Sequence, residues 1–315
     1  MKVLITGITG MVGSAFAQAY REQGAEVWGV ARNSAASRME ALRDANILRC
    51  DILERDGLEK VFDKIKPDVV IHMAAQAFNG ISRDCEYLTH ATNYTGTLNV
   101  LKCAMKNGGS AKVLLACSSA AYGDFDPADC PLKEERGLHP VTPYGVSKAG
   151  AELLGYQYYA NYGLSVYLPR MFIHVGTGHP PETAIQNIAR QLALIARGKA
   201  EPVLRLGNLE SARDFIDVRD GVQAMMLLLE HGRPGESVNI CTGKAYKISE
   251  VLAMLLQISG LQVEVVQDAA LLRVSDEPLL LGDNSKITAY GFRQRYSMEE
   301  TLFEVYHDWL ERVPC

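Results

Sequence analysis

A glycine-rich turn near the N-terminus constrains the fold of this chain more than any other feature. The apolar run KVLIT at residues 2–6 is followed directly by Gly7, Gly10 and Gly13 in the string TGITGMVG. The apolar residues then recur with a helical period over residues 12–23. Glycines at this junction allow a tight turn and leave the N-terminal amides of the helix facing an anion. We therefore predict a strand, a glycine turn and a helix as the first unit.

The same alternation continues through the first half of the chain. Further strands are predicted at AEVWGVA, NILRCD, DVVIHMAA and AKVLLACSS, and further helices over residues 57–65 and 95–106. Several of these strands are almost wholly apolar, as expected where helices cover both faces of a sheet. Alternating elements favour right-handed crossovers and a parallel sheet. The predicted fold is therefore α/β, a doubly wound parallel sheet of the Rossmann type.

The second half of the chain carries shorter patterns. A long helix is predicted to begin near Tyr144, followed by the strand LSVYLPRMF and a helix over residues 183–197. No linker or low-complexity segment separates the two halves. We predict a dinucleotide-binding domain over residues 1–170 and a smaller C-terminal α/β substrate lobe over residues 171–315, with some later segments returning to the first domain.

Composition narrows the class of ligand. The net charge of −5 and the absence of any Lys/Arg run argue against nucleic acid or an anionic membrane as a partner. The seven cysteines are scattered without a C-x-x-C pair, which predicts reduced thiols in a cytoplasmic protein, without a disulfide framework or a metal site. No apolar stretch resembles a signal peptide or reaches membrane-spanning length. We expect a small-molecule ligand.

Residues at the carboxyl ends of the predicted strands form the candidate cofactor site, because ligands of open α/β sheets bind at that edge. They are Gly7, Thr9, Gly10, Met11, Val12, Gly13, Asp51, Ile52, Ala74 and Ala75. The second strand ends beside Arg32, where an arginine accommodates the 2′-phosphate of NADP(H) and an acidic residue would hold the free ribose of NAD(H). A turn without ligand and a solvated Arg32 are the alternatives. The position of both within the strand–helix repeat favours NADP(H).

Three side chains are candidates for catalysis. Ser118 follows the fifth strand, and Tyr144 and Lys148 lie one helical turn apart in PYGVSK. An ammonium beside a phenol stabilises the phenolate, so we expect Lys148 to lower the pKa of Tyr144 from about 10 toward neutrality. Ser118 would hydrogen-bond the substrate oxygen. Each residue alone could be a strand end, a helix start or a solvated lysine. A hydrolase nucleophile at Ser118 is disfavoured because no G-x-S-x-G elbow surrounds it.

In this order the motifs resemble those of extended short-chain dehydrogenases/reductases, a family of sugar-nucleotide epimerases, dehydratases and reductases. NYTGT at residues 93–97 and PVTPYGVSK at residues 140–148 extend the resemblance, which covers essentially the whole chain. GNLESARDFIDVRD at residues 207–220 and the later GDNSK at residues 282–286 resemble, within the family, GDP-mannose 4,6-dehydratases and their sister 4-ketoreductases. The resemblance implies a nucleotide-sugar substrate.

It also implies roles for further residues. Asn93, Tyr144 and Lys148 would lie at the cofactor. Residues implied at the substrate are Ser119, Ile173, His174, Asn208, Arg213, Arg273 and Asp276, with the two arginines on the diphosphate. Ile173 replaces an asparagine and Val274 a proline of the family pattern, which leaves the sugar and the base open. His174 could equally be a packed histidine.

The resemblance further implies a homodimer built through helices of the first domain, including the helix that carries Tyr144 and the helix near Asn99. Four apolar residues on the Tyr144 helix could belong to that interface or to the core of the domain. They are Ala149, Leu153, Leu154 and Tyr158.

A missing acid separates the possible reactions. Dehydratases of this kind carry a glutamate two residues before the Y-G of the segment SSAAYG, and here that position is Ala120. Alanine cannot move a proton, so we expect NADPH-dependent reduction of the 4-keto group of a nucleotide-activated 6-deoxyhexose, from GDP-4-keto-6-deoxy-D-mannose to GDP-D-rhamnose. A GDP-mannose 4,6-dehydratase or NDP-sugar epimerase with a base from elsewhere is one alternative. A non-catalytic NADP-sensing protein is another.

Overall fold

The computed structural model describes residues 1–32, 42, 45–268, 271 and 277–313. Arg273 and Asp276, both predicted at the substrate, lie outside the described residues. Within the described part, no helix combines the length and the apolar character needed to cross a membrane.

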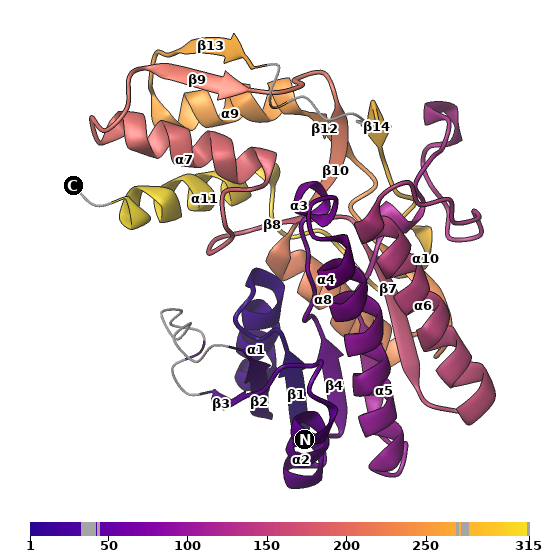
Figure 1. Cartoon of the computed structure of the whole chain (residues 1–315). Coiled ribbons are helices and arrows are strands. Elements are labelled where there is room, and N and C mark those ends of the chain that lie inside the picture. Colours follow the sequence, from indigo (N-terminus) through magenta and orange to yellow (C-terminus); the bar gives the residue numbers. More distant parts are fainter. Residues whose placement is uncertain (33–41, 43–44, 269–270, 272–276, 314–315) are drawn as a thin grey trace.

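A parallel sheet forms the centre of the molecule (Figure 1). Its strand order is β11-β7-β5-β4-β1-β2-β3, with β6 paired to β7. The strands are β1 Lys2–Thr6, β2 Glu26–Ala31, β3 Asn46–Arg49, β4 Val69–His72, β5 Lys112–Leu115, β6 Cys117–Ser118, β7 Val166–Met171 and β11 Ser237–Ile240. Every pairing is parallel, so the carboxyl ends of the strands meet at one edge. The predicted α/β fold of the Rossmann type is confirmed.

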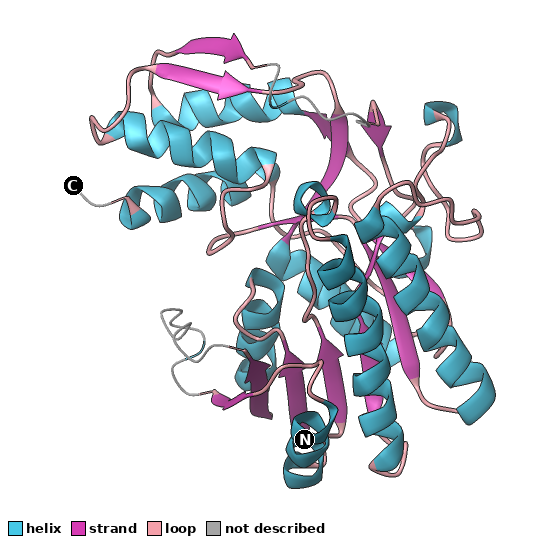
Figure 2. Ribbon diagram, viewed as in Figure 1, coloured by secondary structure: helices cyan, strands magenta, loops and turns pink. Residues whose placement is uncertain are grey.

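Helices cover both faces of this sheet (Figure 2). One face carries α1 (Met11–Glu22), α8 (Val218–His231) and α10 (Ser285–Ala289); the other carries α2 (Arg55–Ile65), α5 (Gly96–Lys106) and α6 (Pro143–Tyr162). Phe16 of α1 and Phe62 of α2 are fully buried on opposite faces. Burial of one such side chain contributes about 1.5–3 kcal/mol. This two-sided burial explains why the strands are apolar throughout.

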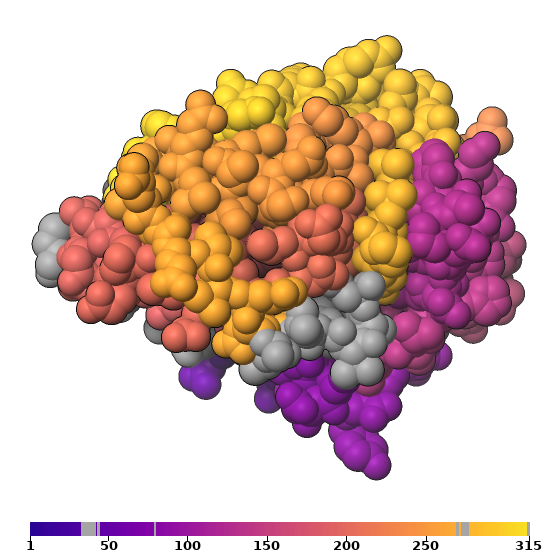
Figure 3. Space-filling model, turned by 90° about the horizontal axis from the view of Figure 1, so that it is seen from above, coloured from indigo at the N-terminus to yellow at the C-terminus, as the bar shows by residue number. Residues whose placement is uncertain are grey.

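The later part of the chain forms a second lobe above the edge of the sheet (Figure 1). Its helices are α7 Ala184–Ala196, α9 Ile248–Ser259 and α11 Met298–Arg312, and its strands are β8 Ile173–Val175, β9 Val203–Leu206, β10 Ala212–Asp217, β12 Ala245–Lys247, β13 Glu264–Gln267 and β14 Leu279–Leu280. Seen from above, this orange and yellow part makes the broad face, with the magenta segment beside it (Figure 3). Leu132 and Gly282 form a bridge at that border.

The lobe is not one continuous stretch of sequence. The chain enters it after β7, but α8 and β11 then return to the sheet, where β11 pairs with β7. α10 also packs beside β11 before α11 closes the lobe. The described residues after 170 therefore contribute both to the sheet domain and to the lobe.

Two predicted elements differ in detail. The strand AKVLLACSS is interrupted at Ala116, whose carbonyl oxygen accepts a hydrogen bond from the Lys148 side chain at 2.8 Å. The helix predicted from residue 95 is continuous with α4 (Glu86–His90) and a π-helical turn (Ala91–Thr95), and a short separate helix, α3 (Asn79–Ser82), precedes them. π-helical turns inside α-helices are frequent at functional sites. Both irregularities lie beside the candidate catalytic residues.

Candidate active site

The glycine turn presents bare backbone at the start of α1. Gly7 has φ +70°, and a Cβ there would lie 2.7 Å from the backbone nitrogen of Ala74. Gly10 is the N-cap of α1 without a side-chain cap, so the first amides of the helix are left for another acceptor. Gly13 packs so closely on the Gly7 carbonyl that a Cβ would overlap it. This cradle fits the diphosphate of a dinucleotide.

The other predicted cofactor residues differ in how far they are exposed at the carboxyl edge of the sheet. Arg32 is exposed directly after β2, and Ala74 and Ala75 are half-buried directly after β4. Asp51, Thr9 and Val12 are half-buried as well, whereas Met11 is buried. Ile52 is only 4% exposed and packs in the core against α2 and α5, so its side chain is a core residue.

Ser118 stands at the end of β6, where the chain turns into a short 3₁₀ helix over Ser119–Ala121. Its Oγ accepts a hydrogen bond from the Ala120 backbone nitrogen at 3.2 Å, which caps that helix. Ser119 is also buried, and its carbonyl oxygen accepts a bond from the Tyr122 nitrogen. The cap holds the Ser118 hydroxyl at the carboxyl edge of the sheet.

Tyr144 and Lys148 lie in the first two turns of α6. Thr142 caps this helix by accepting a bond from the Gly145 nitrogen at 3.1 Å, and Pro143 occupies the first helical position. Lys148 Nζ lies 5.9 Å from the centre of the Tyr144 ring. The structure therefore brings Tyr144 and Lys148 to the same edge as Ser118.

The protonation states differ from the expectation. Burial raises the pKa of Tyr144, and a hydrogen bond with Ser118 opposes this only in part. Burial lowers the pKa of Lys148 to about 8. The prediction that Lys148 lowers the pKa of Tyr144 is wrong for this arrangement, because the ammonium is itself desolvated and bonded to the Ala116 carbonyl. Tyr144 is a protonated phenol at neutral pH.

Asn93, predicted at the cofactor, is bonded within the protein. It is 2% exposed and lies in the π-turn. Its Oδ1 accepts a bond from the Gln76 nitrogen at 2.8 Å, and its Nδ2 donates to the Gln76 oxygen at 3.0 Å and to Ser147 Oγ at 2.9 Å. Ser147 Oγ donates in turn to the Tyr144 carbonyl at 2.7 Å. Asn93 therefore ties the loop after β4 to the first turn of α6.

Ile173 and His174 lie on β8, which pairs with β10. Both are half-buried. His174 Nδ1 is 2.9 Å from the Phe172 carbonyl oxygen, and its buried Nε2 has no partner. Burial lowers the pKa of His174 to about 4, which keeps the ring neutral. β8 follows β7, whose last residue pairs with Ser118, so this segment lies next to the catalytic edge.

Arg213 and Asn208 lie on the lobe. Arg213, in β10, is 8% exposed and donates to the Ala212 and Glu277 carbonyl oxygens. Its Nη2 is 3.7 Å from a carboxylate oxygen of Glu277. Asn208 is half-buried and accepts a bond from the Glu210 nitrogen at 2.9 Å. These contacts place Arg213 beside the stretch that precedes β14.

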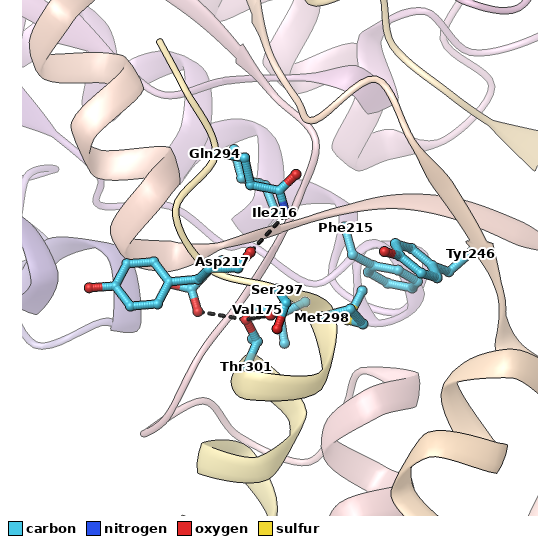
Figure 4. Close-up of a pocket in the computed structure, with 10 residues that line it drawn as sticks. Val175, Phe215, Ile216, Asp217, Tyr246, Gln294, Ser297, Met298 and Thr301 are labelled. Carbon is cyan, nitrogen blue, oxygen red and sulfur yellow. Dashed lines mark hydrogen bonds between the residues drawn. The ribbon is translucent and has the colours of Figure 1, made fainter.

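A small, partly open pocket between β10 and α11 is separate from these residues (Figure 4). Its volume of about 10 Å³ suits one water molecule. Asp217 accepts a bond from Thr301 Oγ1 at 2.7 Å at its wall and pairs with Arg219. None of the predicted site residues lines it. The pocket therefore belongs to the packing of the lobe and not to the candidate active site.

Sequence analysis missed several residues that hold the site together. Gln76 and Ser147 carry the bonds of Asn93, and Ser147 lies inside the PYGVSK motif itself. Glu152 continues the spacing of Tyr144 and Lys148 by another four residues and is only 4% exposed. Helical spacing could have identified Glu152, whereas the Gln76 contact depends on tertiary structure.

Comparison with known proteins identifies the family. The family model described as GDP-mannose 4,6 dehydratase matches residues 4–305. The chain belongs to this family. It is 34% identical to the GDP-6-deoxy-D-mannose reductase of Pseudomonas aeruginosa over 84% of this chain and 87% of that protein. It is 29% identical to the GDP-mannose 4,6-dehydratase of Yersinia enterocolitica over 88% of this chain and 78% of that protein.

A solved structure agrees with the family. The structure described as RMD from Pseudomonas aeruginosa complexed with NADPH superimposes with a TM-score of 0.85 and 32% identity, and the match covers 99% of each chain. The relatives are sugar-nucleotide reductases and dehydratases. This member of the family is therefore an oxidoreductase that uses a nicotinamide cofactor.

Proposed function

We propose that this enzyme reduces the 4-keto group of a nucleotide-activated 6-deoxyhexose with NADPH, converting GDP-4-keto-6-deoxy-D-mannose to GDP-D-rhamnose. The observation that carries the proposal is the combination of catalytic groups at one edge: Ser118 and Tyr144 share the site, and Ala120 stands where a dehydratase needs its second acid/base. Similarity to a GDP-6-deoxy-D-mannose reductase supports the same substrate class.

Three residues would each have a separate role in this reduction. NADPH supplies a hydride to C4 when bound. Tyr144 donates a proton to the developing C4 oxygen, and its raised pKa keeps the phenol in the acid form that ketone reduction requires. Ser118 hydrogen-bonds the same oxygen and orients it. Lys148 would hold the nicotinamide ribose.

The preference for NADPH rests on Arg32. This side chain is exposed directly after β2, where a positive charge can meet a 2′-phosphate, and the glycine turn would hold the diphosphate. A structurally similar protein is described in complex with NADPH. Arg213, and Arg273 beyond the described residues, would bind the diphosphate of the substrate, with Ser119, Ile173, His174, Asn208 and Asp276 nearby.

A dehydratase is the second candidate, because the matching family model bears that name and a relative of that name is 29% identical. Incubation with GDP-mannose alone separates the two activities. A dehydratase releases a 4-keto-6-deoxy product without added NADPH, whereas the reductase leaves GDP-mannose unchanged.

The proposal is tested by consumption of NADPH and of NADH with GDP-, dTDP- and UDP-linked 4-keto-6-deoxyhexoses. We expect turnover with the GDP sugar and NADPH, and a loss of at least about 100-fold in kcat for Tyr144→Phe because proton donation is removed. If Tyr144→Phe left NADPH consumption unchanged across the panel, the protein would be better described as a non-catalytic NADP-sensing protein.

We also infer a homodimer formed through α6 and α4. The helix near Asn99, α5, is also expected at the interface, but within the described chain it contributes none of the exposed large apolar side chains. Exposed apolar and aromatic side chains gather instead at α6 and α4: Tyr87, Leu88, Tyr94, Val146, Leu153, Tyr156, Tyr159 and Tyr162. Between the two helices lies a hollow of about 540 Å³. Of the four residues considered from sequence, Leu153 is 62% exposed, whereas Ala149, Leu154 and Tyr158 are buried in their own subunit. An exposed patch of this kind is typical of a protein interface.

A further inference from the structure

A buried ion pair that the proposed reaction does not use lies behind the active site. Glu152 of α6 and Arg170 of β7 are 4% and 5% exposed. Arg170 donates to the Glu152 carboxylate from Nη2 at 2.6 Å and from Nε at 3.0 Å. Ser237 Oγ donates to the same carboxylate at 2.7 Å. Both charges are therefore removed from water and held by several directional bonds.

The carboxylate shares a helical face with the catalytic residues. Tyr144, Lys148 and Glu152 follow one another at intervals of four residues in α6, so they lie in a row along its axis. Lys148 bonds the Ala116 carbonyl just before β6, and Glu152 bonds Arg170 on the neighbouring strand β7. The helix is thus anchored to the sheet at two successive turns.

Arg170 is tied at the same time to the segment that follows Ser118. In the register of β6 and β7, Cys117 pairs with Arg170 and Ser118 pairs with the next residue, Met171. The guanidinium lies 4.8 Å from the centre of the Tyr122 ring, which ends the short helix after Ser118. Its Nη1 donates to the Glu134 carbonyl oxygen at 2.9 Å. The Arg170 side chain therefore contacts α6, which carries Tyr144, and Tyr122 in the segment that follows Ser118.

Stability alone does not explain such a pair. Buried ion pairs pay a large desolvation penalty, and apolar replacements of similar volume are often equally stable. What the pair adds is a fixed geometry, since a bidentate guanidinium–carboxylate contact allows little rotation of either partner. Small displacements of reacting groups, of about 1 Å, reduce rates by up to about 100-fold.

We propose that Glu152 and Arg170 form a positioning pair that sets the spacing between Tyr144 on α6 and Ser118 at the end of β6. The proposal rests on the proposed function insofar as Ser118 and Tyr144 act on the substrate. The pair does not touch the cofactor turn at Gly7, which supplies the diphosphate site, so loss of the pair should act mainly on the chemical step.

The first test is Glu152→Gln, which keeps the shape and removes the charge. We expect kcat to fall at least about tenfold while KM for NADPH stays within about twofold. Asp220→Asn is the matched control. Asp220 is a fully buried carboxylate on the opposite face of the sheet, where it accepts bonds from the Arg295 and Tyr296 nitrogens. This variant should lower Tm and leave kcat within about twofold.

The double variant Glu152→Leu/Arg170→Met separates stability from positioning. It changes no net charge and removes both buried charges together, so its Tm should lie above that of Glu152→Gln. Its kcat should nevertheless stay at least about tenfold below the wild-type value. Values of kcat within twofold of wild type in both variants, after correction for the folded fraction, would overturn the proposal.

A readout without substrate distinguishes this proposal from failure of the proposed function. In protein labelled with ¹³Cζ-tyrosine, the Tyr144 signal is assigned by its absence in Tyr144→Phe. The charge-neutral double variant should shift this signal and its titration, because the spacing between Tyr144 and Ser118 changes. An unchanged Tyr144 signal would contradict the positioning role whatever the substrate is.

Discussion

At the residue scale, burial sets the protonation states on which the chemistry depends. Tyr144 is kept as a phenol because burial raises its pKa, and burial lowers the pKa of Lys148 to about 8. The folded-state pKa of Lys148 is thus below the unfolded value of about 10.4, so this group opposes folding below pH 8 and ceases to do so as pH rises toward 10.4. Below pH 8 the site therefore keeps the Lys148 charge at a cost in stability.

His72 gives the clearest pH prediction. Its two ring nitrogens contact Thr6 Oγ1 at 2.7 Å and Thr97 Oγ1 at 3.0 Å, and burial, then the nearby Lys148 charge, lowers its pKa to about 3. The unfolded chain binds a proton here below about pH 6.5 that the native chain does not. The free energy of unfolding is therefore not reduced by His72 above pH 6.5, and it declines as the pH falls toward 3.

His72→Gln should flatten that decline. We expect the loss of unfolding free energy between pH 6.5 and pH 4 to be roughly 3 kcal/mol smaller than in the wild type. Urea denaturation at a series of pH values measures the difference. Equal slopes in the two proteins would show that His72 is not the group that titrates.

At the element scale, the glycine turn makes the strictest demand on side-chain size. Gly7 and Gly24 have similar positive φ angles, +70° and +74°, but a Cβ at Gly24 would meet nothing within 4 Å. Alanine at either position introduces about 1–2 kcal/mol of backbone strain. Only at Gly7 does it also collide with the Ala74 backbone and narrow the cradle.

Gly7→Ala should therefore weaken NADPH binding by at least about tenfold, or about 1.4 kcal/mol, whereas Gly24→Ala should bind NADPH as the wild type does. NADPH fluorescence titration measures both affinities. Equal NADPH affinities for the two variants would show that the glycine turn does not bind the cofactor.

Elements with a regular pattern could be predicted from the sequence, and irregular ones could not. The helix from Pro143 to Tyr162 begins where the motif indicates, because Thr142 and Pro143 are strong local start signals. The strand break at Ala116 and the π-turn at Ala91–Thr95 depend on bonds from distant side chains. The candidate catalytic group follows from short motifs, whereas the Glu152–Arg170 pair requires the strand order to be known.

At the scale of the whole molecule, the apolar patch on α4 and α6 predicts association. Leu153→Glu places a charge at an exposed position of α6 in this patch and should convert the dimer to a monomer, because burying an unpaired carboxylate is unfavourable. Val265→Glu, at an exposed site on β13 in the lobe, is the control and should leave the dimer intact. Sedimentation velocity measures both. A wild-type monomer at micromolar concentration would contradict the interface.

We propose that this enzyme transfers hydride from NADPH to C4 of a keto sugar nucleotide, and isotope labelling can follow this transfer. The transfer is tested most directly with NADPH dideuterated at C4 of the nicotinamide and GDP-4-keto-6-deoxy-D-mannose, followed by NMR of the product. We expect one deuterium at C4 of the resulting 6-deoxyhexose, and no such product from Tyr144→Phe. Formation of a 4-keto-6-deoxy sugar from GDP-mannose without added NADPH, and no deuterium transfer, would contradict it.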